Sequence, residues 1–462
     1  MEDGSEISSE NSGLTRSAVK TLNSGENLEN VDFKTDKGGE NALLVESGES
    51  SVKGGTVEKK GDDDSEGARI YGTNSAIYAQ GDESSLSAEN LTISTSAKNG
   101  HALFLSDGAN SVLDNTTIET TSEYSDGIVV SNGASFYSNN VNITTKSKYS
   151  SPVFAGNSGG GMTFMGGEFK SFASNSPAIY SESDVYMENA KISSRNSEAV
   201  VAGGNCFVDL RQTVISSTDE QKNDYSQSAQ GILISSHTPN NHESRSVFQA
   251  ENSAIITDHG DHIFVSNADA DIFLRHSLFI KNNSDGIFLR AVANPDVQSG
   301  DNGGIVNLYT ENQDVIGNIE VDSASSINLN LSDSYFKGAI RGEGKKDLTI
   351  SNETVVVLTE DMHVDSLTNV VEDNQNIYAN GHKFFVADKE IAVNNEAAPE
   401  SIIQYTGEFF ENAVWASEHR DTGVPVIVWI GVAVGVAVVI GGLLFVFRNK
   451  FMRRSRRPRI EI

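Results

Sequence analysis

A residue type that tolerates left-handed backbone geometry returns about every 25 residues along most of this chain. Six of the ten occurrences are Asn and two are Gly, the residues that adopt positive φ at the lowest cost. The positions are Asn30, Gly54, Asn90, Asn115, Asn140, Gly166, Asn189, Arg211, Asn252 and His276. An apolar residue stands three positions after each one, as Ile118 follows Asn115. A corner repeated at a regular period predicts a stack of coils.

A second apolar column repeats with a similar period. It comprises Ala42, Ala76, Ala102, Ile128, Val153, Ala178, Ala199, Ile232, Ile263 and Ile287. Each of these residues opens a short apolar run among Ser, Thr, Asn, Asp and Gly, which is typical of β-strands bounded by turns. We therefore predict an all-β parallel solenoid over residues 25–300, with about three short strands per coil.

The corner column resembles that of the right-handed parallel β-helix in the pectate-lyase-like and adhesin families. The resemblance covers residues 25–300 and involves no catalytic motif. It implies a right-handed coil in which corner amides hydrogen-bond from one coil to the next. The residues expected in this ladder are Asn30, Asn90, Asn115, Asn140, Asn189 and Asn252. Arg211 and His276 depart from the pattern, so the ladder is expected to be interrupted there.

Charge and cysteine content exclude several classes of protein. The chain has 64 acidic and 34 basic residues, a net charge of −30. Such a surface repels phosphate backbones, so we expect no nucleic-acid partner. Cys206 is the single cysteine, which excludes an internal disulfide framework, and we interpret it as a small buried residue. No cofactor or metal is expected.

The segment 424–447 contains no charged residue and is long enough, at about 36 Å as a helix, to cross a bilayer. A basic tail, 448–462, follows it. Its cationic residues are Arg448, Lys450, Arg453, Arg454, Arg456, Arg457 and Arg459. This asymmetry predicts a cytoplasmic tail with the acidic portion outside. Gly431 and Gly435 have the spacing of a close helix pair, so a helix-mediated dimer is one interpretation.

The N-terminal end of the predicted external portion leaves open how the chain is exported, and its C-terminal end leaves open how the chain is attached to the surface. Residues 1–24 are polar and contain no apolar export segment. Either an export segment lies upstream, which we favour because the basic tail indicates orientation, or the chain is a tail-anchored cytoplasmic protein. Before the apolar span, Thr422 and Gly423 match only the end of a Leu-Pro-x-Thr-Gly sorting signal, so we expect a retained membrane anchor.

Residues 301–393 are predicted to form further β-rungs, because apolar and polar side chains alternate from Ile319 to Ile350, as in Ile327, Leu329 and Leu331. They resemble the closing rungs of autotransporter-like and Gram-positive adhesin passengers, which implies a cap for the solenoid. Residues 394–423 are predicted to form a polar stalk. Insertions are expected at 59–67, 217–230 and 237–246. The run Asp62 to Asp64 in the first insertion is interpreted as a solvated loop, with a calcium site as the alternative.

One group of residues could support catalysis. Asp258, His259, Asp261 and His262 form one turn, and Asp285 follows about one coil later. If Ile263 and Ile287 are aligned, Asp261 and Asp285 stack about 4.8 Å apart, close enough for retaining glycoside chemistry. Asp126 occupies the same column in mid-stack, so we interpret these aspartates as turn residues and expect no enzyme activity.

The sequence therefore predicts a single-pass protein of the cell surface whose β-helix acts in adhesion or surface interaction, with glycans or host components as ligands. One alternative is a cell-surface polysaccharide lyase or glycoside hydrolase. The other is a passive structural spacer of the same shape.

Overall fold

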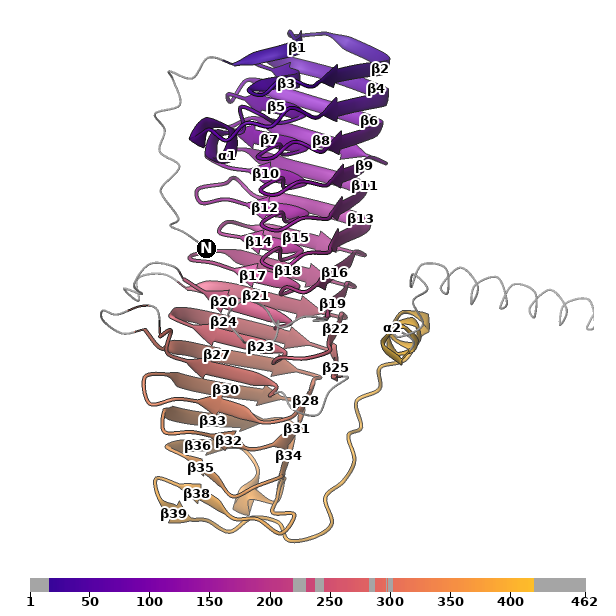
Figure 1. The fold of residues 1–462 in the computed structure, drawn as a ribbon. Coiled ribbons are helices and arrows are strands. Elements are labelled where there is room, and N and C mark those ends of the chain that lie inside the picture. The colour runs from indigo at the N-terminus through magenta and orange to yellow at the C-terminus, as the bar shows by residue number, and fades with distance from the viewer. Residues whose placement is uncertain are drawn as a thin grey trace, which may run out of the picture. The chain divides into compact units, whose positions relative to one another are not determined.

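The computed structural model describes residues 16–218, 230–236, 245–281, 287–295, 297 and 302–418. The chain divides into two compact units, residues 1–405 and 406–462. In the first unit the strands stack coil upon coil, and every ladder among the described residues is parallel except that between β38 and β39 (Figure 1). The predicted all-β parallel solenoid is confirmed.

Each coil contributes one strand to a first sheet. This sheet contains, in spatial order, β1 (Ser17–Leu22), β3 (Glu40–Val45), β5 (Ile77–Gln80), β7 (Leu103–Ser106), β10 (Ile128–Val130), β12 (Val153–Ala155), β14 (Ile179–Ser181), β17 (Val200–Ala202), β20 (Ile232–Ser235), β23 (Ile263–Ser266), β26 (Leu289–Val292), β29 (Ile319–Val321) and β32 (Ile340–Arg341). Because β1 pairs with β3, the stack begins ahead of the predicted start at residue 25.

After the first sheet the chain forms a strand, turns at the corner residue and forms a second strand. We call the two resulting surfaces the pre-corner face and the post-corner face. Five long strands bend through the corner and belong to both faces: β2 (Asn27–Thr35), β4 (Gly48–Lys59), β6 (Ser84–Thr95), β11 (Ser135–Thr145) and β13 (Met162–Ser171). In each of the other coils, two separate strands, one before and one after the corner, take the place of one bent strand.

The separate pre-corner strands are β8 (Asn110–Asp114), β15 (Val185–Glu188), β18 (Phe207–Arg211), β21 (Ser246–Glu251), β24 (Ala268–Arg275), β27 (Gly304–Glu311), β30 (Ser326–Ser332), β33 (Lys345–Ser351) and β36 (Ser366–Asn369). The post-corner strands are β9 (Thr117–Thr120), β16 (Lys191–Arg195), β19 (Val214–Thr218), β22 (Ala254–Thr257), β25 (Leu278–Lys281), β28 (Asp314–Ile316), β31 (Tyr335–Gly338), β34 (Val355–Leu358) and β37 (Ile377–Tyr378).

The corner residues have the left-handed backbone that the sequence pattern predicts. The six Asn corners have φ between 47° and 56°. Gly54, Gly166 and His276 also have positive φ. The corner assigned to Arg211 is wrong: Arg211 pairs with Glu188 and Glu251 inside the sheet, and Gln212, with φ 47°, makes the turn. Asn312, Asp333 and Asn352 continue the column beyond residue 300.

Corner side chains hydrogen-bond between neighbouring coils at particular steps of the stack. The Asn140 amide donates to Asn115 Oδ1 at 2.9 Å, and Asn252 Oδ1 lies 3.0 Å from His276 Nδ1. The interruption expected at His276 is therefore absent from this step, because the imidazole takes the place of an amide. Asn90 donates instead to Glu89 of its own coil.

A buried serine column, which the sequence pattern did not indicate, supports the turn between the post-corner face and the first sheet. The hydroxyl oxygen of each serine accepts from a backbone N–H of the preceding coil. The bonds run Gly100 N to Ser125 Oγ, Ser125 N to Ser150 Oγ, Ser150 N to Ser176 Oγ and Ser176 N to Ser197 Oγ, at 3.0–3.3 Å. Buried backbone N–H donors need hydrogen-bond partners. The serine hydroxyls supply these partners at a turn, where the N–H groups make no ladder hydrogen bond.

The second apolar column has the correct period but a partly wrong register. Ladder pairing aligns Leu43, Ile77, Leu103, Ile128, Val153, Ile179, Val200, Ile232, Ile263 and Leu289. The predicted column was therefore one residue early at the five alanines and two residues early at Ile287. In the N-terminal coils these strands are apolar on both sides, since Tyr78 and Phe104 on the outer side are also buried. Hydrophobicity consequently does not distinguish the two sides.

The first predicted insertion contains a short helix, α1 (Glu66–Tyr71), which lies against the first sheet (Figure 1). Ser65 caps its first turn, and Gly72 ends it in the left-handed region with φ 65°. A Cβ at Gly72 would lie 2.3 Å from the Phe104 ring, so the helix end packs closely on the outer side of that strand. Most of the other two predicted insertions, residues 219–229 and 237–244, lies outside the described residues.

Past residue 300 the coils continue in the same parallel register through β27, β30, β33 and β36. The stack ends with β35 (Met362–Val364), a 3-10 turn at Glu372–Asn374, β38 (Phe384–Val386) and β39 (Lys389–Glu390). The antiparallel strand β39 pairs with β38, so it covers an edge that would otherwise be open.

Part of the segment predicted as a polar stalk lies against the post-corner face. The Tyr335 hydroxyl donates a hydrogen bond to Pro399 O at 3.1 Å, and the Asp314 N–H donates one to Tyr405 Oη at 3.0 Å. The Tyr405 ring stacks on His276 with centroids 5.1 Å apart. Burial raises the pKa of Tyr405, so its hydroxyl stays neutral.

The second unit is described only for residues 406–418, where α2 (Glu408–Glu418) is the single helix. In the part of the chain that the structure describes, no helix combines the length and apolar character needed to cross a bilayer. The predicted span at 424–447 and its basic tail lie outside the described residues. Membrane anchoring therefore stays a prediction.

We predict that Asn115→Ala lowers the free energy of unfolding by about 1–3 kcal/mol, because alanine pays for a left-handed backbone and Asn140 loses its acceptor. Asn115→Gly, which removes the same acceptor but accepts positive φ, should cost less. Urea denaturation followed by circular dichroism compares the two variants. Equal destabilisation by both would contradict a role for backbone conformation at the corner.

Candidate functional site: an aromatic hollow on the pre-corner face

Outward-facing side chains of the pre-corner face form vertical columns because the ladders keep the coils in register. One column contains Tyr137, Thr163, Tyr186 and Asp209 on successive coils. Each of them stands three residues before its corner residue. Neighbouring strands are about 4.8 Å apart, so Tyr137 and Tyr186 lie two steps, or about 9.6 Å, from each other.

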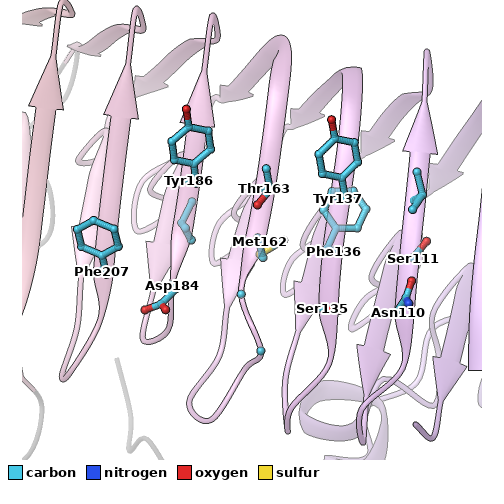
Figure 2. A pocket seen from close by; sticks show the side chains of 14 residues that line it. Asn110, Ser111, Ser135, Phe136, Tyr137, Met162, Thr163, Asp184, Tyr186 and Phe207 are labelled. Carbon is cyan, nitrogen blue, oxygen red and sulfur yellow. The ribbon is translucent and has the colours of Figure 1, made fainter. Parts of the chain in front are cut away.

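A hollow of about 450 Å³ lies over this part of the pre-corner face. Tyr137 and Tyr186 flank the shorter Thr163, and Phe207 and Asp184 lie at the hollow as well (Figure 2). The floor is low because Thr163 stands between two tyrosines. On the same coil, Gly160 and Gly161 present no side chain to the hollow. Figure 2 shows both tyrosine rings extended along their strands with their hydroxyls at the same end.

Hydrogen bonds hold the two tyrosines in these positions. The Tyr186 hydroxyl donates to Glu188 Oε2 at 2.6 Å, and the Tyr137 hydroxyl donates to Asn139 Oδ1 at 3.1 Å. Asn139 in turn donates to Asp114 Oδ1 at 2.8 Å. Burial, followed by the Glu188 contact, raises the pKa of Tyr186 to about 12, so the ring remains a neutral phenol. These hydrogen bonds therefore hold the two aromatic rings in fixed positions.

Exposed aromatic area is the unusual property of this hollow. Tyr137 is 40% exposed and Phe207 is 38% exposed, although outward positions of a strand are usually polar. Rigid aromatic rings with polar neighbours are typical of ligand-binding surfaces. The sequence carried a signal for Tyr137 and Tyr186, because each stands three positions before a predicted corner, where the side chain faces outward. Phe207 stands five positions before Gln212, a corner that the sequence pattern placed wrongly.

The positive charge of Arg211, which lies beside the hollow, is already paired. Arg211 donates two hydrogen bonds to Asp209 Oδ2, at 2.9 Å and 3.1 Å, and lies 3.9 Å from Glu251. Its guanidinium also lies over the Tyr186 ring, 5.6 Å from the centroid. Among the described residues that line the hollow, Asp184 is the only one with a charged side chain. The site thus offers hydrogen-bonding groups and aromatic faces but no cation for an acidic ligand.

Asp261, a predicted candidate for catalysis, is buried and bound through both carboxylate oxygens. Oδ1 accepts from Ile287 N at 2.8 Å, and Oδ2 accepts from Arg290 Nε at 2.7 Å. Asp126 likewise accepts from Ser151 N of its next coil, at 2.6 Å. Both aspartates therefore make the same coil-to-coil contact.

The other two candidates do not join Asp261 in a described site. Ile263 pairs with Leu289, so the alignment with Ile287 that placed Asp285 over Asp261 is wrong. Asp285 itself lies outside the described residues. Asp258 is partly buried and donates its backbone N–H to Ser217 O at 3.1 Å.

The three consecutive aspartates of the first insertion bind different groups. Asp62 Oδ1 accepts from Lys98 N at 2.7 Å, Asp63 Oδ1 accepts from Ser65 N at 2.9 Å, and Asp64 pairs with the Lys98 ammonium at 2.6 Å. Over the described ranges, no group of three or more His, Cys, Asp or Glu side chains is arranged to hold a metal ion.

Comparison with known proteins adds little to these observations. No protein-family model matches the chain, and no curated protein matches it. Among solved structures, the A-module of the mannuronan C-5 epimerase AlgE6 from Azotobacter vinelandii is similar at 11% sequence identity. The match covers 83% of this chain and 92% of that chain with a TM-score of 0.19. The fold is therefore assigned from the ladder register of the chain itself.

We predict that acid destabilises this protein partly through His262, the buried neighbour of Asp261. Burial lowers the pKa of His262 to about 3, whereas an unfolded histidine titrates near about 6.5. Between these values only the unfolded chain binds the proton. The free energy of unfolding should therefore fall as pH decreases from about 6.5 towards 3, by up to about 1.4 kcal/mol per pH unit from this residue.

The measurement is the free energy of unfolding against pH, from urea denaturation of the wild type and of His262→Phe. The phenylalanine should flatten the curve in this window, because it packs with Phe279 and Phe288 without titrating. His259→Gln, at an exposed position of the same turn, is the control for a histidine substitution at this place in the coil. An unchanged slope in His262→Phe would refute the assignment.

Proposed function

We propose that this chain is a surface-displayed β-helix protein that binds a glycan in the aromatic hollow, and that residues 424–447 anchor it in a membrane. The observation that carries the proposal is the pair of preorganised tyrosines on either side of Thr163. Sugar rings present apolar C–H faces and many hydroxyls. Flat aromatic faces beside amide, hydroxyl and carboxylate groups complement both kinds of surface.

The composition of the hollow favours binding over catalysis. Glycoside hydrolysis of the common type uses two carboxyl groups on opposite sides of the scissile bond. Of the described residues lining the hollow, Asp184 alone carries a carboxylate, and none of them is Lys, Arg or His. The paired oxygens of Asp261 also support a structural role for that residue. Adhesion, with the coils as a rigid support, is the interpretation that these contacts favour.

Membrane display rests on the sequence. The uncharged span at 424–447 and the basic tail after it support an anchor with the acidic coils outside. The net charge of −30 keeps such a surface soluble and disfavours acidic partners. A passive spacer of the same fold would have no need of exposed, hydrogen-bonded tyrosines in a hollow.

We predict that the full-length protein in detergent micelles binds members of an oligosaccharide array, and that Tyr186→Ala weakens this binding about tenfold or more, the loss typical of a buried aromatic anchor. Tyr149→Ala is the matched control, because that ring stacks on Tyr124 outside the hollow. Thermal unfolding of each variant checks that it folds. Absence of any bound glycan, or equal losses in both variants, would remove the proposal and favour the spacer.

We also predict that bound oligosaccharides are recovered intact after incubation with the protein. Asp261→Asn and Asp285→Asn should leave glycan affinity unchanged, since Asp261 acts on its neighbouring coil. Chromatography of the oligosaccharide after incubation measures turnover. Cleavage or modification that either variant abolishes would establish the alternative, a polysaccharide lyase or hydrolase.

A further inference from the structure

The column that supplies the two hollow tyrosines carries a second aromatic pair farther along the stack. From Tyr186 the ladder pairs lead through Asp209 and Gln249 to Phe273 and then Tyr309. The Phe273 and Tyr309 rings stack with centroids 4.9 Å apart and planes at 10°. Phe273 is 38% exposed. Six coil steps separate Tyr137 from Tyr309, a distance of about 29 Å.

The surface between the two aromatic pairs is polar. Asp209 is buried beneath its pairing with Arg211, and Gln249 is the outward residue of the next coil. Both aromatic pairs therefore lie in one column along the stack, joined by groups that form hydrogen bonds. Because successive coils repeat about every 4.8 Å, such a column can contact successive units of an extended ligand.

The charges along the column argue against an acidic ligand. Arg275 pairs with Glu311 at 2.7 Å and with Glu251 at 3.6 Å. Arg245 pairs with Asp271 at 2.7 Å and with Asp269 at 3.2 Å. Like Arg211, these arginines already have carboxylate partners, so a polyuronate or sulfated chain would have to displace them.

We propose that Phe273 and Tyr309 form a second subsite, and that the ligand is a linear glycan without acidic groups that runs along the stack over both aromatic pairs. This inference rests on the proposed glycan-binding function. Two coil steps, about 9.6 Å, match the span of a disaccharide unit in an extended glycan, so the tyrosines of the hollow contact one unit. A chain of about six sugar residues is needed to reach Tyr309 as well.

The experiment measures dissociation constants of the full-length protein for fluorescent β-1,4-linked gluco-, manno- and N-acetylglucosamine oligosaccharides, from the disaccharide to the octasaccharide. In the wild type, affinity should rise between the tetrasaccharide and the hexasaccharide, when the second subsite is reached. The double variant Phe273→Ala, Tyr309→Ala should leave disaccharide affinity unchanged. It should weaken hexasaccharide and longer chains about tenfold, because the second contact is intramolecular.

Phe172→Ala, an exposed aromatic residue outside both pairs, is the matched control, and thermal unfolding tests the fold of every variant. Equal losses at all chain lengths, or no loss at any length while Tyr186→Ala still weakens binding, would overturn the second subsite and leave the hollow as a glycan site. Tighter binding of oligo-uronates than of neutral chains would overturn the ligand class. Failure of every oligosaccharide to bind would overturn the proposed function itself.

Discussion

The vertical register of the left-handed corners is the constraint on which the rest of this structure depends. A residue such as Asn115 can turn the chain only with positive φ, and the next coil must turn at the same place for its strands to pair. When the corners of successive coils are aligned, parallel ladders form on either side of them. Side chains at equivalent positions of neighbouring coils then lie one above the other. The hydrogen bond that the Asn140 amide donates to Asn115 Oδ1 is a consequence of that alignment.

The same register places polar groups inside the stack without leaving backbone groups unpaired. At the turn before the first sheet, Ser125, Ser150 and Ser176 each accept a backbone N–H from the preceding coil. Asp126 and Asp261 accept a backbone N–H from the following coil. A buried donor without a partner costs about 1–3 kcal/mol, so these contacts let turns of differing length occur within one stack.

Register also explains how a surface site can arise on a repetitive fold. Each coil presents one outward side chain three residues before its corner, so the size of that side chain on successive coils shapes the surface. A hollow forms where the short side chain of Thr163 lies between the large side chains of Tyr137 and Tyr186. Where Phe273 and Tyr309 are adjacent, the rings fill the step between them and stack. The same column thus forms a hollow at one level and a platform at another.

The sequence by itself determined the class of fold, because the cost of positive φ restricts each corner to a few residue types and makes the period visible. It also contained the outward positions of Tyr137, Tyr186 and Phe273, each of which stands three residues before a predicted corner. Tertiary structure decided the register of the first sheet, because strands apolar on both sides hide which residue faces inward, as at Tyr78 and Phe104. It alone decided that Gln212 makes a corner, that Ile263 pairs with Leu289, and that Asp261 binds its neighbouring coil. Those outcomes depend on hydrogen bonds between residues many positions apart, which a local pattern of side chains does not encode.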